Sequence, residues 1–152
     1  MANKIKWAVE SGVTLMDSEL QNAEDLDVVN ADSDYDNATE LNRWADFLFK
    51  ATEWDDDPSA GAVVELHLFY KFDETNYADG EDGDHVNPNP TGNSWHGIFN
   101  IDTVNGVNYQ QILRVPLSPF AFRASVVLKT GQDLTDVGTH FLKMYPYNEE
   151  LQ

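Results

Sequence analysis

Hydrophobic and polar residues alternate along several stretches of the chain, most clearly between Leu113 and Thr130. In the second half of this stretch every second position is apolar: Phe120, Phe122, Ala124, Val126 and Leu128. The residues between them are mixed, which is typical of a strand with one face in a core and the other mostly in water. Pro116 and Pro119 cannot donate to a strand ladder, so they mark a turn between two strands.

Further segments have the composition or alternation of strands, and turn-forming Gly, Pro, Asn and Asp separate them. These segments are residues 1–16, 26–29, 41–54, 62–72, 95–103, 109–117 and 139–145. Only one short helix is expected, near residues 17–23, with Asp17 as its N-cap and Leu20 as its inward contact. Seven to nine strands with so little helix predict an all-β protein, an antiparallel β-sandwich of the jelly-roll kind.

The chain of 152 residues is of the usual size for one domain. We expect residues 1–16 to form an extended N-terminal arm or edge strand. Residues 17–146 are predicted to form a single β-sandwich domain, and residues 147–152 a C-terminal tail. The chain has no cysteine, so disulfides and thiolate sites are excluded. Its N-terminus has no apolar stretch typical of a secretory signal, and no apolar run is long enough for a membrane span.

The formal net charge is −18, and most of it lies in the first half of the chain. Residues 17–84 contain 21 of the 27 acidic residues and only three basic ones. Nucleic-acid and anionic-membrane binding are both disfavoured, because each needs a lysine- or arginine-rich surface. Two interpretations of the acidic half remain: a solvated surface that resists aggregation, or a surface that binds a basic partner or cations.

One acidic segment starts like a calcium-binding loop, since Asp32, Asp34 and Asp36 occupy the first, third and fifth positions. An EF-hand is excluded, because Asn37 stands where glycine is needed and Arg43 where a bidentate glutamate is needed. A looser calcium site, shared with Asp55 to Asp57 or with Asp79 to Asp84, is the remaining alternative. The weak calcium candidates are Asp32, Asp34, Asp36, Asp79, Asp82 and Asp84. A solvated loop is the simpler interpretation, so we predict no cofactor and no metal.

No motif supports catalysis. Ser94 and His96 are close in sequence, but the following glycine is one residue too late for a nucleophile elbow. None of the four histidines is paired with another at metal-ligand spacing, and His67 and His96 are each expected within a strand. Carboxylates are so numerous that any pair could be selected as a glycosidase pair. The protein is therefore predicted not to be an enzyme.

Several short motifs resemble a family of small virion structural proteins of tailed bacteriophages. They occupy residues 13–17, 36–39, 75–80, 115–117, 129–132 and 142–150. Members of this family look like single β-sandwich domains on the virion and have no known catalytic motif. This chain departs from the family pattern in its extra acidic residues at 24–36 and 79–84.

The resemblance implies a non-enzymatic virion protein, assembled in the host cytoplasm. We expect a capsid decoration or stabilising protein on the outer head shell, bound to the major capsid protein and forming a homo-oligomer, with a trimer favoured. The expected partner-contact residues are Ile5, Trp7, Val9, Tyr145 and Tyr147. The alternative is a binding module of the tail or fibre that recognises carbohydrate or calcium. A carboxylate-dependent hydrolase ranks third.

Overall fold

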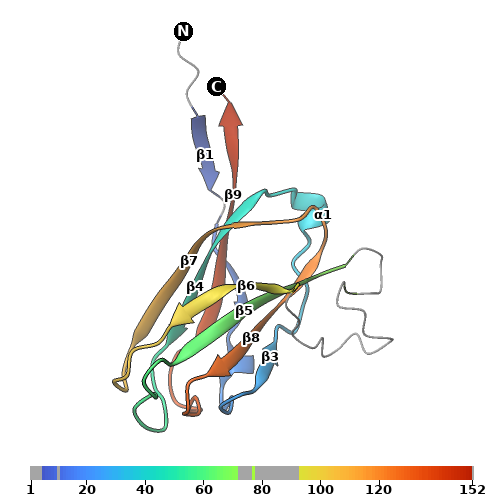
Figure 1. Ribbon diagram of the computed structural model, residues 1–152. Coiled ribbons are helices and arrows are strands. Elements are labelled where there is room, and N and C mark those ends of the chain that lie inside the picture. The colour runs from blue at the N-terminus through green and yellow to red at the C-terminus, as the bar shows by residue number, and fades with distance from the viewer. Residues whose placement is uncertain (1–4, 10, 72–76, 78–92, 152) are drawn as a thin grey trace.

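The computed structural model describes residues 5–9, 11–71, 77 and 93–151, with backbone only at residues 5–9, 150 and 151. Nine strands and two short helical turns make up this part of the chain (Figure 1). The strands are β1 (Ile5–Val9), β2 (Val13–Met16), β3 (Val28–Asn30), β4 (Trp44–Ala51), β5 (Val63–Tyr70), β6 (Trp95–Asn100), β7 (Asn108–Pro116), β8 (Phe122–Lys129) and β9 (Phe141–Leu151). The helical turns are η1 (Ser18–Leu20) and α1 (Asn37–Glu40).

The strands form two antiparallel sheets that pack as a sandwich, which confirms the predicted fold class. Sheet A has the order β1/β2-β9-β4-β7, and sheet B has the order β3-β8-β5-β6. Strands from the two halves of the chain pair as nested partners: β2 with β9, β3 with β8, β4 with β7 and β5 with β6. This is the winding of a jelly roll, a long hairpin rolled into two sheets.

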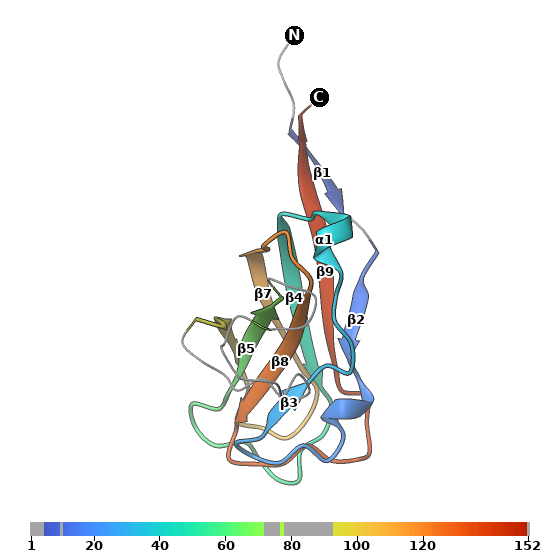
Figure 2. The same ribbon diagram turned by 90° about the vertical axis from the view of Figure 1, so that its right-hand side faces the viewer.

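β1 and β2 share one edge of β9, so sheet A is four strands wide although it contains five strands. β2 pairs with β9 near Met144, and β1 pairs with its last five residues, Tyr147 to Leu151. Figures 1 and 2 show that β1 and the end of β9 project beyond the sandwich as a two-stranded ribbon, whose last described pair is formed by positions 5 and 151. We call this ribbon the arm. The segment that we predicted as a C-terminal tail, residues 147–152, is thus strand up to Leu151.

The core lies between the sheets and follows the alternation of the sequence. In β4 the residues at every second position, from Ala45 to Ala51, are buried and the others are half-buried. Phe49 of sheet A meets Phe99 of sheet B with ring centroids 5.4 Å apart, and both side chains are fully buried. Burial of aromatic residues from both inner faces is the main force that holds the two sheets together.

The loop from β3 to β4 contains α1, a helix that the sequence analysis did not anticipate. Asp36 caps it by accepting from the backbone N–H of Thr39 at 3.2 Å, and Leu41 ends it in the left-handed conformation with φ of 55°. The first helical residue, Asn37, is buried and bonds both the chain at Asn42 and the turn before β8. No helix in the described part of the chain is long and apolar enough to cross a membrane.

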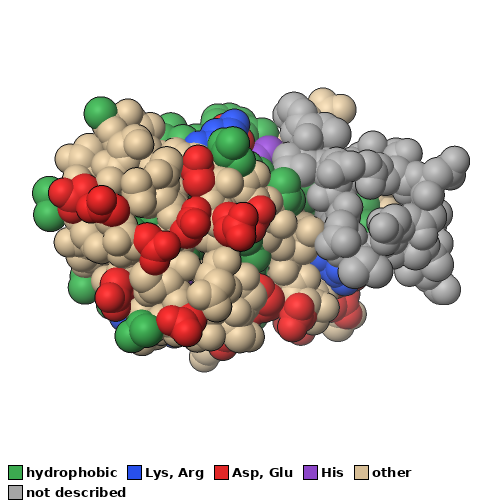
Figure 3. Space-filling view, turned by 90° about the horizontal axis from the view of Figure 1, so that it is seen from below, with side chains coloured by type: hydrophobic (Ala, Val, Ile, Leu, Met, Phe, Trp, Pro, Cys, Tyr) green, Lys and Arg blue, Asp and Glu red, His purple; other side chains and the backbone are tan. Residues whose placement is uncertain are grey.

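Acidic side chains gather at the end of the sandwich opposite the arm. Four loops meet there: residues 17–27, 52–62, 101–107 and 130–140 (Figure 1). They contain twelve acidic residues and no lysine or arginine. Figure 3, which views the molecule from this end, shows carboxylates spread across the surface. We call this surface the acidic end.

Candidate assembly interface

The strand register brings the five predicted contact positions onto one face of the molecule. In β1, positions 5, 7 and 9 lie opposite positions 151, 149 and 147 of β9. Directly opposite residues of an antiparallel pair share a face, so these positions and Tyr145 all belong to the outer face of sheet A. Residues far apart in the chain therefore form one continuous surface that starts on the arm.

The two tyrosines on this surface are both anchored to the sandwich. Tyr147 is largely buried and donates its hydroxyl proton to Asp46 Oδ1 at 3.2 Å. Tyr145 covers Gly12, where an added Cβ would lie 2.6 Å from the Tyr145 Cε1 atom. A side chain at position 12 would displace this ring, so glycine permits the close passage of the chain between β1 and β2. The base of the arm is thereby fixed to the domain.

Beside these tyrosines, Arg114 joins β7 to the arm. Its guanidinium bonds Glu149 Oε1 at 3.2 Å and lies over the ring of Trp44, 5.1 Å from the centroid. The backbone N–H of Arg114 also donates to Asp46 at 2.7 Å. Because the Arg114 side chain is 59% exposed and the Glu149 side chain 34% exposed, this ion pair contributes to the orientation of the arm more than to stability.

Farther from the arm, the same face carries two lysines set between aromatic rings. The Nζ of Lys50 lies 5.3 Å from the ring centroid of Tyr109 and 5.5 Å from that of Phe141. The Nζ of Lys143 lies 4.5 Å from the same Phe141 ring. We call these four residues the lysine row. Sequence reasoning missed it, because the pairing of three distant strands creates it.

The aspartates predicted as weak calcium ligands do not converge in the described part of the chain. Asp36 caps α1. Asp32 is exposed, and among the described residues no side-chain hydrogen bond links it to Asp34 or Asp36. No group of three or more His, Asp or Glu residues with metal-site geometry occurs among the described residues. Asp79, Asp82 and Asp84 lie outside the described residues, as does His85.

Asp34 instead binds two cationic side chains and a phenol. One carboxylate oxygen accepts from Tyr77 Oη at 2.7 Å and from Arg123 Nε at 2.9 Å, and the other contacts Lys71. Burial alone would raise the pKa of Asp34, but the hydrogen bonds from Lys71, Tyr77 and Arg123 outweigh burial and lower this pKa. A carboxylate neutralised in this way links β8, Lys71 just after β5, and Tyr77.

The fold also brings Ser94 to His67, a pair that the sequence did not indicate. Ser94 Oγ lies 3.0 Å from His67 Nδ1, and Glu65 Oε2 lies 3.5 Å from His67 Nε2. The order serine, histidine, glutamate is that of a nucleophilic triad. However, Ser94 is only 5% exposed and His67 only 4%, so a substrate carbonyl has no approach to the hydroxyl in this conformation. The Ser94–His67 contact is a buried polar link between β5 and the residue that precedes β6.

Buried histidines give the fold a dependence on pH. His140 accepts from the Thr52 backbone N–H through Nδ1 at 3.3 Å and donates from Nε2 to the Thr135 carbonyl at 3.1 Å. This pattern fits only the neutral ring, since a proton on Nδ1 would face another donor. Burial is the main cause that lowers the pKa of His140, and the same holds for His67 and His96.

We therefore expect the protein to lose stability in mild acid. The unfolded chain binds protons on these histidines near pH 6.5, whereas the folded chain binds them only at lower pH. The stabilisation is complete above pH 6.5 and decreases as the pH falls from there through the lower pKa of each folded histidine. Each histidine adds at most about 1.4 kcal/mol per pH unit. Urea unfolding at pH 7.5 and 5.5 measures the loss, and in His140→Gln the loss should be smaller. Equal stability at both values would contradict the expectation.

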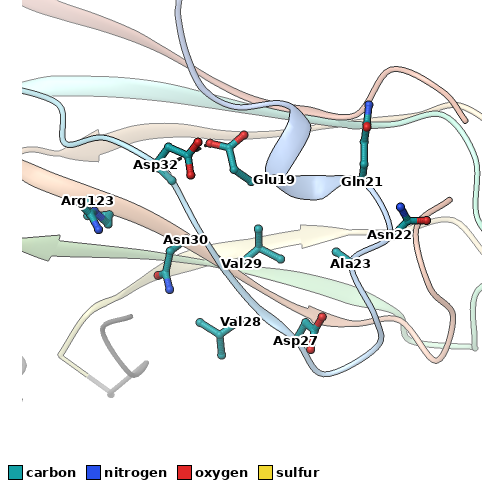
Figure 4. Close-up of a pocket in the computed structure, with 11 residues that line it drawn as sticks. Glu19, Gln21, Asn22, Ala23, Asp27, Val28, Val29, Asn30, Asp32 and Arg123 are labelled. Carbon is teal, nitrogen blue, oxygen red and sulfur yellow. Dashed lines mark hydrogen bonds between the residues drawn. The ribbon is translucent and has the colours of Figure 1, made fainter. Parts of the chain in front are cut away.

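A cavity of about 400 Å³ opens on the flank where η1 meets β3. Figure 4 shows Glu19 and Asp32 pointing toward each other at one end of it, with Asp27 at the other end. Glu19 Oε1 accepts from the Asp32 backbone N–H at 3.1 Å. The lining includes three acidic side chains and one base, Arg123, whose guanidinium bonds Asp34.

No protein family matches the chain, and no curated protein matches it either.

Proposed function

We propose that this protein is a non-enzymatic virion structural protein of a tailed bacteriophage that decorates and stabilises the outer head shell. The arm binds the shell, with the major capsid protein as partner, and the acidic end faces outward into water. The single observation that carries this proposal is the arm itself. It extends beyond the domain, and its register gathers the contact positions onto one face.

The arm has the properties of an assembly element rather than of a domain element. A two-stranded ribbon alone in water is at best marginally stable, so it needs a further surface to pack against. Among the described strands, β1 pairs on one edge only, with β9. A free strand edge is a ready template for pairing with another chain, and strand addition is a common mode of attachment.

The distribution of charge supports the same orientation. Twelve acidic residues lie in the four loops of the acidic end, whereas the outer face of sheet A carries Lys50, Lys143 and Arg114. A strongly acidic surface keeps crowded copies soluble and apart from one another. A protein present at high local density on a particle needs this property on its outward end.

Deletion of residues 2–12 tests the proposal. The truncated protein lacks β1 and should lose binding to purified head shells, while the sandwich, which the rest of the chain forms, should still unfold cooperatively. Quantitative gel densitometry after sedimentation gives the number of copies per shell. If the deletion variant occupies shells to the same level as the full chain, the role of the arm is wrong.

A matched control comes from the other end of the molecule. Asp55→Asn with Asp56→Asn removes two exposed charges from the acidic end and leaves the arm intact. This variant should decorate shells with the same number of copies as the wild type. A loss of binding equal to that of the deletion would place the contact at the acidic end instead.

The second candidate function is a carbohydrate-binding module of the tail or fibre. It is favoured by two exposed aromatic residues, Trp95 on β6 and Tyr109 on β7, which are 50% and 55% exposed. Aromatic rings of this kind stack on sugars. A specific hit on a glycan array that Tyr109→Ala or Trp95→Ala removes would favour this function over shell binding.

A further inference from the structure

The lysine row is unusual because its two cations have aromatic neighbours and, among the described residues, no acidic partner. None of the ion pairs in the described part of the chain involves Lys50 or Lys143. Both side chains are half-buried, and the neighbouring Tyr109 is 55% exposed. The chain has 27 acidic residues, yet these two lysines contact aromatic rings instead of carboxylates. Their charge is therefore available to a partner.

A surface of opposite charge lies on another side of the same molecule. Residues 17–32, which form η1, β3 and the loop between them, contain six acidic residues and no basic one. This segment supplies most of the lining of the flank cavity described above. We call it the acidic flank. The acidic flank contains a cavity, whereas the lysine row stands on the face of a sheet. Asp27 and Asp32 are both exposed on the acidic flank.

We infer that the lysine row of one copy docks on the acidic flank of a second copy. The lysine ammonium groups approach the carboxylates at the cavity, and the rings of Tyr109 and Phe141 are removed from water around them. Charge complementarity selects the partner and the register, whereas burial of the rings supplies the affinity. This inference goes beyond the proposed role of the arm and does not depend on it.

The two surfaces share no residue, so the contact is heterologous. A heterologous contact leaves one free surface on each end of a pair, so it repeats and gives a ring where the rotation closes and an open filament where it does not. The assembly expected here takes the closed form, a ring of three or more copies. The acidic flank includes residues 17–27 of the acidic end, whereas the arm takes no part in the contact and stays available on every subunit.

Charge reversal on each surface separately tests this contact. Lys50→Glu with Lys143→Glu alters the lysine row, and Asp27→Lys with Asp32→Lys alters the acidic flank. Light scattering at about 0.15 M salt should give the mass of a ring for the wild type and of a monomer for each variant. An equimolar mixture of the two variants should associate again, because the intact lysine row of one variant meets the intact acidic flank of the other, and the two reversed surfaces are also opposite in charge.

Two controls carry the same change in charge at other places. Arg43→Glu with Lys129→Glu matches the first variant, and Asp55→Lys with Asp136→Lys matches the second. Both should assemble as the wild type does, and urea unfolding verifies that every variant is folded. A monomeric wild type, a variant that still forms rings, a mixture that stays monomeric or a control that dissociates would each overturn the inference. Shell binding is not involved, so failure here leaves the test of the arm intact.

Discussion

Replacing Phe49 by alanine should lower the free energy of unfolding by about 3–5 kcal/mol, the range for a fully buried phenylalanine. Phe49 is 0% exposed and is the point where sheet A meets Phe99 of sheet B, with ring centroids 5.4 Å apart. Its removal opens a cavity between the two sheets, and this cavity can close only if one whole sheet moves toward the other. Since small domains have only about 5–15 kcal/mol of stability in total, the variant should be close to its unfolding limit.

Urea unfolding followed by tryptophan fluorescence measures this loss. Phe141→Ala is the matched control, because this ring lies on the outer face of sheet A and is only half-buried. It should cost much less than Phe49→Ala. A double-mutant cycle with Phe99→Ala should give a coupling of about 0.5–1.5 kcal/mol, as expected for an aromatic pair. Equal losses at positions 49 and 141 would contradict the assigned core.

Asn37→Asp should be the most damaging change of a single polar group. The Asn37 amide nitrogen donates to the carbonyl oxygens of Asn42 at 2.9 Å and Ser118 at 2.7 Å. A carboxylate of the same shape cannot donate, so the buried Asn42 carbonyl and the partly buried Ser118 carbonyl lose their partner and face a negative charge. Each buried unsatisfied group costs about 1–3 kcal/mol. We expect a loss of about 3–5 kcal/mol at neutral pH, which includes the cost of the buried charge.

The same chemical change at an exposed amide provides the control. Asn100→Asp at the end of β6 adds the same charge on the surface and should change the stability by less than about 0.5 kcal/mol. Thermal unfolding of both variants at pH 7 and pH 4 separates the cost of the lost hydrogen bonds from the cost of the buried charge. In acid the carboxyl group introduced by Asn37→Asp is protonated and can donate to one carbonyl, so the gap between the variants should narrow. If the difference in stability between the two variants is the same at pH 7 and at pH 4, the introduced charge plays no part in the loss.

The strands could be predicted because each one repeats a two-residue pattern that local sequence reveals. The expected strand at 62–72 corresponds to β5 at Val63–Tyr70, and the expected strand at 109–117 corresponds to β7 at Asn108–Pro116. The outer face of β8 was expected mostly in water, but Ser125 and Val127 on that face are buried. The sequence of one strand shows its two-residue alternation, but it does not show which other residues cover the second face of the strand.

The surface of the molecule was less predictable, because it depends on which strands become neighbours. Lys50, Tyr109 and Phe141 are separated by up to 91 positions in the chain and meet only through the register of β4 with β7 and β9. Likewise, His67 and Ser94 carry no shared motif and meet where β6 begins beside the middle of β5. The arm was anticipated on the N-terminal side alone, since the last residues resemble a polar tail in sequence and become strand only by pairing with β1.

The position of β9 has a consequence for the synthesis of the protein. This strand leaves the ribosome after the other eight described strands, yet it is paired with β1, β2 and β4. Sheet A therefore lacks its second interior strand until β9 has been synthesised, and the apolar faces of the earlier strands stay exposed to water during that time. Such long-range pairing slows folding and exposes the chain to aggregation. The strong negative charge of the first half, which emerges first, would keep nascent chains on one polysome apart during this interval.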